Sequence, residues 1–122
     1  LSFLSPSSNN ATNDISDFSL MGNWKNDKFS IEYSFKNDST AYFEQGGFGT
    51  MTKYIMDDSK TPIWIDFTTV MGNNSITIPG LMQIIHKDTI VIEQFSPGSN
   101  HPTSFTEEDG QLNNKHTLYR MK

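Results

Sequence analysis

The chain of 122 residues has no cysteine and only nine basic residues, one of which is arginine. Without cysteine it can form no disulfide, no thiol nucleophile and no zinc site of the cysteine type. The basic residues are scattered, and the formal net charge is −5 at pH 7. Because phosphate groups are bound by clustered lysine and arginine, this composition argues against a nucleic-acid partner and against an anionic membrane surface.

Long apolar runs and helical periodicity are lacking as well. No run approaches the roughly 20 apolar residues of a membrane-spanning helix, so we expect no transmembrane segment. Only residues 14–21 could form a short N-terminal helical turn. Residues 1–17 are rich in serine and asparagine, which predicts a flexible leader or tether ahead of a domain over residues 18–122.

The first residue is not methionine. A chain of this kind results when an exported precursor loses a signal peptide or a lipid-anchored leader upstream of residue 1, and also when a clone is trimmed. On the first interpretation the protein is periplasmic, a cell-surface lipoprotein, or secreted.

A period of two runs through the sequence from Leu20 onward. In residues 28–35, for example, every second side chain is large and apolar: Phe29, Ile31, Tyr33 and Phe35. Similar segments, separated by polar or glycine-containing turns, cover residues 40–44, 48–56, 63–70, 89–95 and 116–121. Residues 76–85 form another, which Pro79-Gly80 interrupts, and a long loop leads to a short segment at residues 102–106. The pattern predicts an all-β domain of eight or nine short strands. We expect an antiparallel up-and-down barrel of about eight strands, which would remove exposed sheet edges.

Two groups of residues resemble a known family. The segment from Leu20 to Trp24 resembles the Gly-x-Trp signature in the first strand of lipocalins. Further matches, in chain order, are residues 62–67 (Pro-Ile-Trp-Ile-Asp-Phe), Gly80, residues 87–90 (Lys-Asp-Thr-Ile), residues 101–105 (His-Pro-Thr-Ser-Phe) and residues 118–120 (Leu-Tyr-Arg). Together they are similar to a widespread group of bacterial lipocalin-like domains of uncharacterised function.

This resemblance covers residues 20–122 and implies an up-and-down barrel in which Trp24 plugs one end. It implies no activity and no agreed functional residues. One position departs from the group, because His101 stands where an arginine usually precedes Pro-Thr.

Catalytic and metal-binding patterns are not found. His86, His101 and His116 are spaced 15 residues apart, without the close pair that is common in zinc sites, and the first two are expected in exposed loops. No nucleophile elbow of the Gly-x-Ser-x-Gly type occurs. The glycine-rich residues 46–49 precede a strand and lack the lysine of a phosphate-binding loop, so they predict a hairpin turn. We therefore expect no enzyme, no cofactor and no metal.

Asp66 lies within a predicted strand, where a carboxylate that is partly enclosed needs a hydrogen-bonding or cationic partner. Arg120, His101 and Lys53 are the candidates. The carboxylate then either has a structural role or anchors a ligand at the floor of a pocket. An enzyme built around Asp66 and a histidine is the remaining alternative.

The fold class favours a non-enzymatic binding domain for a small apolar or amphipathic ligand, held inside the barrel or at its mouth. Methionine and aromatic side chains adapt to irregular ligands, although at strand spacing they also form ordinary core. The candidate ligand-binding residues are Trp64, Asp66, Met51, Met71, Met82, Phe95, His101 and Arg120. The alternative is a protein-interaction module with a filled barrel, such as an envelope lipoprotein or an immunity-type inhibitor, with residues 107–110 as contact surface.

Overall fold

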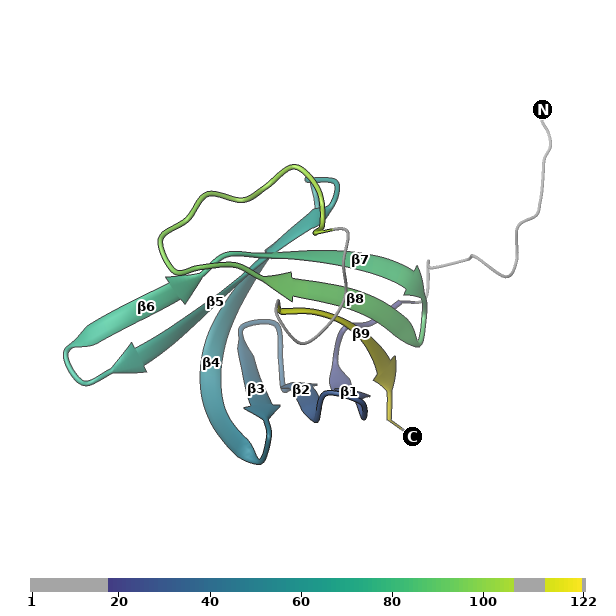
Figure 1. Cartoon of the computed structure of the whole chain (residues 1–122), viewed down its shortest axis with the longest axis horizontal. Coiled ribbons are helices and arrows are strands. Elements are labelled where there is room, and N and C mark those ends of the chain that lie inside the picture. The colour runs from purple at the N-terminus through teal and green to yellow at the C-terminus, as the bar shows by residue number, and fades with distance from the viewer. Residues whose placement is uncertain (1–17, 107–113, 122) are drawn as a thin grey trace.

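The computed structural model describes residues 18–106 and 114–121, and within them it contains nine β-strands (Figure 1). The strands are β1 (Gly22–Asn26), β2 (Ile31–Phe35), β3 (Thr40–Gln45), β4 (Phe48–Asp57), β5 (Ile63–Met71), β6 (Asn74–Ile78), β7 (Gly80–His86), β8 (Thr89–Gln94) and β9 (Asn114–Arg120). The predicted leader, residues 1–17, lies outside the described residues, and so do residues 14–17 of the expected helical turn. Residues 18–21 of that turn are not helical. No helix able to span a membrane is found in the described part of the chain.

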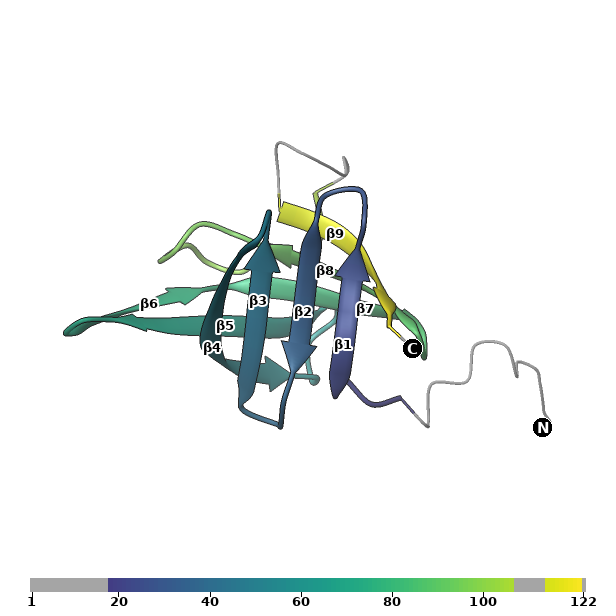
Figure 2. The ribbon, with the colours of Figure 1, turned by 90° about the horizontal axis from the view of Figure 1, so that it is seen from below.

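Eight of the strands close into an antiparallel barrel (Figures 1 and 2). Neighbours in the barrel follow the chain from β1 to β5 and from β7 to β9, and the pairs β5–β7 and β9–β1 complete the ring. β6 and β7 pair in succession with β5 and are separated by Pro79. The predicted antiparallel barrel is confirmed, as is the interruption of the segment 76–85, whereas residues 102–106 form a loop and not a strand.

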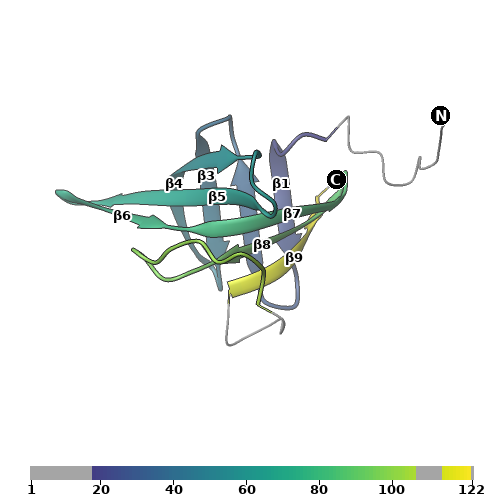
Figure 3. The same ribbon diagram turned by 90° about the horizontal axis from the view of Figure 1, so that it is seen from above.

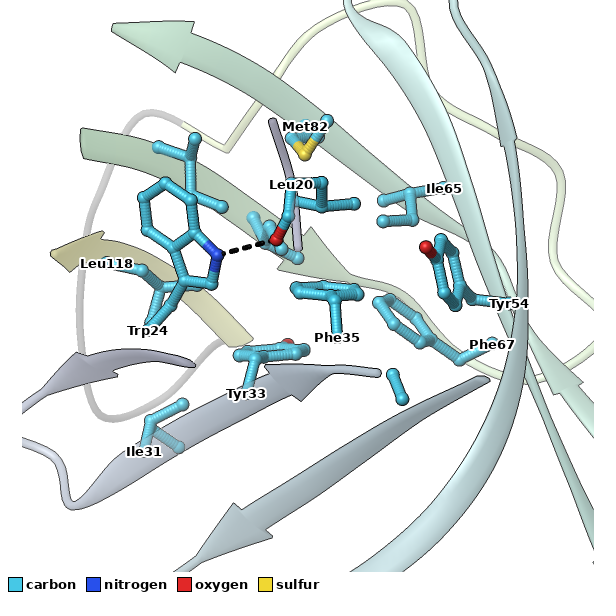
Figure 4. Packing of buried hydrophobic residues seen from close by; sticks show 13 residues of the cluster. Leu20, Trp24, Ile31, Tyr33, Phe35, Tyr54, Ile65, Phe67, Met82 and Leu118 are labelled. Carbon is cyan, nitrogen blue, oxygen red and sulfur yellow. Dashed lines mark hydrogen bonds between the residues drawn. The ribbon is translucent and has the colours of Figure 1, made fainter. Parts of the chain in front are cut away.

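The barrel is filled with side chains (Figure 4). Tyr33 lies at the centre of the aromatic part of this core, with its ring centroid 5.9, 4.9 and 5.7 Å from those of Phe35, Phe43 and Phe67. Its hydroxyl accepts a hydrogen bond of 2.6 Å from Gln94 Nε2. The alternation predicted for residues 28–35 is confirmed over β2, where Ile31, Tyr33 and Phe35 are all buried, whereas residues 28–30 lie in the preceding turn. Aromatic rings thus occupy the space that a larger barrel would offer to a ligand.

The buried Tyr33 leads to a prediction about alkaline pH. Burial raises the pKa of Tyr33 far above its ordinary value of 10.0, and the hydrogen bond from Gln94 opposes this only in part. Since the unfolded chain ionises first, the stability linked to neutral Tyr33 is complete below pH 10 and is lost as pH rises further. We expect urea unfolding to show a lower free energy of unfolding at about pH 11 than at about pH 8. The decrease should be smaller in Tyr33→Phe, and an equal decrease in both proteins would contradict this assignment.

One end of the barrel is crossed by residues 18–21, which two side chains hold in place. Trp24 is fully buried there, and its Nε1 donates to the carbonyl oxygen of Leu20 at 2.9 Å (Figure 4). The guanidinium of Arg120 lies 4.2 Å over the Trp24 ring and donates to the carbonyl oxygens of Ser19 and Met21 at 2.6 and 2.8 Å. The expected position of Trp24 at a barrel end agrees with this arrangement.

Gly22, two positions before Trp24, has a backbone conformation that favours glycine. Its φ of +118° is unfavourable for other residues, and a Cβ there would lie 3.3 Å from Arg120 Nη1. Glycine therefore lets the backbone turn into β1 while the guanidinium passes close by.

A hairpin projects from the barrel (Figures 1 and 3). The register of β4 with β5 ends at the pair Lys53–Thr68, whereas β5 and β6 remain paired out to Met71 and Asn74. We call residues 69–76, which lie beyond the pair Lys53–Thr68, the projecting hairpin. The expectation that closure removes all exposed edges is wrong here, because β6 is the last strand of the sheet.

Candidate functional site

A pocket of about 450 Å³ opens at the barrel end that residues 18–21 cross. Its apolar lining comes from that segment and from inward-facing positions of β4, β5 and β7: Phe18, Leu20, Met21, Met56, Ile63 and Ile84. Tyr54 contributes part of its buried wall. We call this space the mouth pocket. Its volume lies in the range of small-molecule sites, which are concave and mainly apolar.

Two carboxylates add negative charge to the mouth pocket. Asp38 lies in the turn between β2 and β3, and Asp58 lies in the turn between β4 and β5. Both are exposed, and neither forms an ion pair with another residue in the described ranges. Burial and, to a lesser degree, the charge of Asp38 raise the pKa of Tyr54. The charge of Asp38 therefore reaches the wall of the pocket.

The same local device shapes both turns. Asn37 Oδ1 accepts hydrogen bonds from the backbone nitrogens of Ser39 and Thr40 at 2.9 and 2.8 Å. Asp57 Oδ1 accepts from the backbone nitrogen and hydroxyl of Ser59 at 3.0 and 2.6 Å, and these bonds lower the pKa of Asp57. A short polar side chain that bonds the backbone two residues ahead fixes a turn of this kind. The next residue in each turn is an aspartate of the mouth pocket: Asp38 follows Asn37, and Asp58 follows Asp57.

The Tyr54 hydroxyl is already engaged, since it donates to the carbonyl oxygen of Asn37 at 2.6 Å. Apolar surface and two unpaired carboxylates therefore remain for a ligand. This combination suits a molecule with an apolar body and a positively charged head. It offers no nucleophile held by a base, which covalent catalysis would require.

None of the eight candidate residues from the sequence lines the mouth pocket. Three of them come together on the outer face of the barrel instead. His101 Nε2 lies 2.6 Å from Asp66 Oδ1, and the His101 ring stacks on Trp64 with centroids 3.8 Å apart and planes 1° from parallel. Lys60 Nζ lies 4.7 Å from the centroid of the same indole. Of the three candidate partners of Asp66, His101 is the one in contact.

The loop that carries His101 covers this outer face. Residues 95–106, which we call the strap, leave β8 and return to it at Glu93 (Figures 1 and 3). Glu93 is only 2% exposed, and its carboxylate accepts hydrogen bonds from the backbone nitrogen of Thr106 at 2.9 Å and from the Thr106 hydroxyl. Leu81, the partner of Glu93 in the register, is fully buried. His101, expected in an exposed loop, is thus partly buried as an anchor of the strap.

The other candidates are dispersed. Met82 belongs to the barrel core, Met51 and Met71 are exposed on β4 and on the projecting hairpin, and Arg120 lies at the barrel end. Phe95 begins the strap and lines a second open pocket of about 400 Å³. The mouth pocket was not predicted, because no signal in the sequence shows that the turns at Asp38 and Asp58 lie at the same barrel end.

The three histidines are also separate. His86 is exposed and accepts a hydrogen bond from the backbone nitrogen of Asp88 at 3.3 Å, whereas His116 is buried with its ring centroid 5.2 Å from that of Phe29. Within the described ranges, no three histidine or acidic side chains are grouped so that they could hold a metal ion.

No model of a known protein family matches the chain, and no curated protein or solved structure matches it either.

Proposed function

We propose that the protein is a non-enzymatic, lipocalin-like binding domain that holds a small amphipathic molecule with a basic head group in the mouth pocket. The observation that carries this proposal is the apolar pocket of about 450 Å³ with two carboxylates at one end of a closed barrel. The closed antiparallel barrel and the positions of Gly22 and Trp24 support the lipocalin-like assignment.

The filled core directs the ligand to the mouth. Tyr33, Phe35 and Phe67 occupy the interior with almost no exposure, and opening a cavity there would require their displacement. Well-packed interiors resist such a change. The mouth needs no rearrangement of the core, because Met56 is still exposed and Ile63 and Ile84 are only partly buried.

The carboxylates select the sign of the head group. The protein carries a net charge of −5, and a cation at the mouth lies near Asp38 and Asp58, whereas an anion is repelled. Both carboxylates are exposed, so each contributes only a fraction of 1 kcal/mol, or up to about that value. We therefore expect the apolar body to provide most of the affinity and the charge to provide a preference of several-fold.

A matched series of ligands tests this proposal. Isothermal titration calorimetry with octylammonium, octanol and octanoate below their aggregation limits compares one apolar chain with three head groups. We expect octylammonium to bind most tightly, by roughly three- to tenfold over octanol, and octanoate to bind most weakly. Equal affinity for all three contradicts the role of the carboxylates, and no saturable binding of any of them contradicts the function.

Variants at the pocket locate the binding. Asp58→Asn and Asp38→Asn should each reduce the preference for octylammonium over octanol, while the affinity for octanol stays unchanged. Ile84→Gln should reduce the binding of all three ligands, because it places a polar but uncharged side chain among the apolar residues. Asp27→Asn is the matched control, since it removes the same charge near a separate pocket at the opposite barrel end.

The alternative function is a protein-interaction module, and a different observation favours it. The exposed apolar side chains of the structure include several on β4 and on the projecting hairpin, with Phe48, Met51 and Val70 among them. Phe48, Met51 and Val70 do not line the mouth pocket, so the two functions can be tested separately.

A further inference from the structure

The projecting hairpin is unusual in its composition. Residues 67–82 contain no aspartate, glutamate, lysine, arginine or histidine, although 19% of the residues in the whole chain are charged. On the hairpin Val70, Met71 and Ile76 are 69%, 58% and 36% exposed. A segment that extends away from the barrel (Figures 1 and 3) therefore presents apolar side chains without charges around them.

The outer edge of β6 is open along the same segment. β6 pairs with β5 on one side, and no hydrogen bond joins its other edge, residues 74–78, to any other described residue. The next backbone bond along the chain lies beyond β6, where the Phe95 nitrogen donates to the carbonyl oxygen of Pro79. Sheet edges in monomeric proteins are commonly protected by lysine, proline, bulges or covering loops, because a free edge can pair with another strand. Within β6 no residue is charged and none is proline.

The register shows which strand fits this edge. β6 reads Asn-Ser-Ile-Thr-Ile. Antiparallel pairing with an identical strand, centred on Ile76, places Ile76 opposite its own copy and Ser75 opposite Thr77. Every resulting pair is uncharged, and β-branched side chains pack well across strands.

The charge distribution favours a second copy over a charged partner. Two chains of charge −5 repel one another, but the charge-free hairpin extends from the barrel and carries none of that charge into the contact. A strongly basic or acidic partner would find no opposite charge on the hairpin. We propose that the protein forms a two-fold symmetric dimer by antiparallel pairing of β6 with β6 of a second copy.

This dimer is closed. The same edge is used by both copies, so the contact is self-complementary and leaves no further β6 edge for growth. The paired segment has only five residues, which corresponds to a contact below the size of a typical permanent interface. We therefore expect a reversible dimer whose population depends on concentration.

Sedimentation equilibrium over a wide concentration range tests the proposal. The protein should change from the mass of one chain to twice that mass as its concentration rises. Ile76→Lys should raise the dissociation constant by roughly tenfold or more, whereas Ile76→Val should leave it nearly unchanged. Ile85→Lys is the matched control, because Ile85 is 46% exposed and lies on β7.

Each outcome decides the matter. Circular dichroism first verifies that the lysine variants are folded, and the amide hydrogens of β6 should exchange more slowly at high than at low concentration. A monomer at all concentrations overturns the proposal, as does a dimer that is weakened equally by Ile76→Lys and Ile85→Lys. Growth beyond two copies overturns the closed geometry.

Discussion

Replacing Trp24 by alanine is expected to lower the free energy of unfolding by about 3–5 kcal/mol, the range typical for a buried tryptophan. The side chain is fully buried and bonds the carbonyl of Leu20. It also packs beneath the Arg120 guanidinium and against Phe18, whose ring centroid is 6.1 Å away. Its removal leaves a cavity and detaches the segment that crosses the barrel end.

Urea unfolding followed by far-ultraviolet circular dichroism measures this loss. Trp64→Ala is the control, because it removes the same side chain from the outer face, where Trp64 is only partly buried. We expect the Trp64 variant to lose less than half as much free energy. Equal losses would mean that the barrel end is no more important to stability than the contact between Trp64 and the strap.

Arg120→Met is the second substitution with a large expected effect, about 2–4 kcal/mol. Methionine retains much of the apolar stem but cannot donate hydrogen bonds. It would abolish the bonds to Ser19, Met21 and Lys87 and the ion pair of 2.9 Å between Nε and Asp88 Oδ1. The Asp88 carboxylate would also lose its partner.

This variant has a functional consequence that a general loss of stability does not explain. Residues 18–21 form one wall of the mouth pocket, so Arg120→Met should weaken octylammonium binding even where the barrel remains folded. Lys25→Met is the control, since Lys25 makes only an exposed ion pair of 3.4 Å with Asp27. Unchanged ligand affinity in a folded Arg120→Met protein would show that the segment is not part of the site.

Much of the fold could be predicted from the sequence, because a half-buried strand imposes a period of two. β2 shows this directly, with Ile31, Tyr33 and Phe35 in the core. The break between β6 and β7 also follows from local chemistry, since Pro79 cannot donate a ladder hydrogen bond. These features depend on near neighbours in the chain.

The environment of the outer face of β5 could not be predicted from the sequence. Residues 63–70 carry large side chains on both faces, with Ile65 and Phe67 toward the core and Trp64 on the outer face. The strap covers the outer face, so Trp64 and Asp66 are partly enclosed without lining the barrel interior. Periodicity cannot reveal a loop that returns over a sheet, because that contact joins residues about 35 positions apart.

The mouth pocket could not be predicted for a related reason. Asp38 and Asp58 each occur in an ordinary polar turn, and Leu20 precedes the first strand. Only the closure of the barrel brings these segments to the same end. The projecting hairpin is likewise invisible in the pattern, because β5 keeps its alternation after it separates from β4.

The most direct test of the mouth pocket is a titration of the isotopically labelled protein with octylammonium, followed by two-dimensional NMR of the backbone amides. The proposed function predicts saturable shifts at Leu20, Tyr54, Asp58 and Ile84, with small or no shifts at His101 on the strap and at Ile76 on the projecting hairpin. Saturable shifts confined to the strap or the hairpin, or no saturable shifts at all, would contradict it.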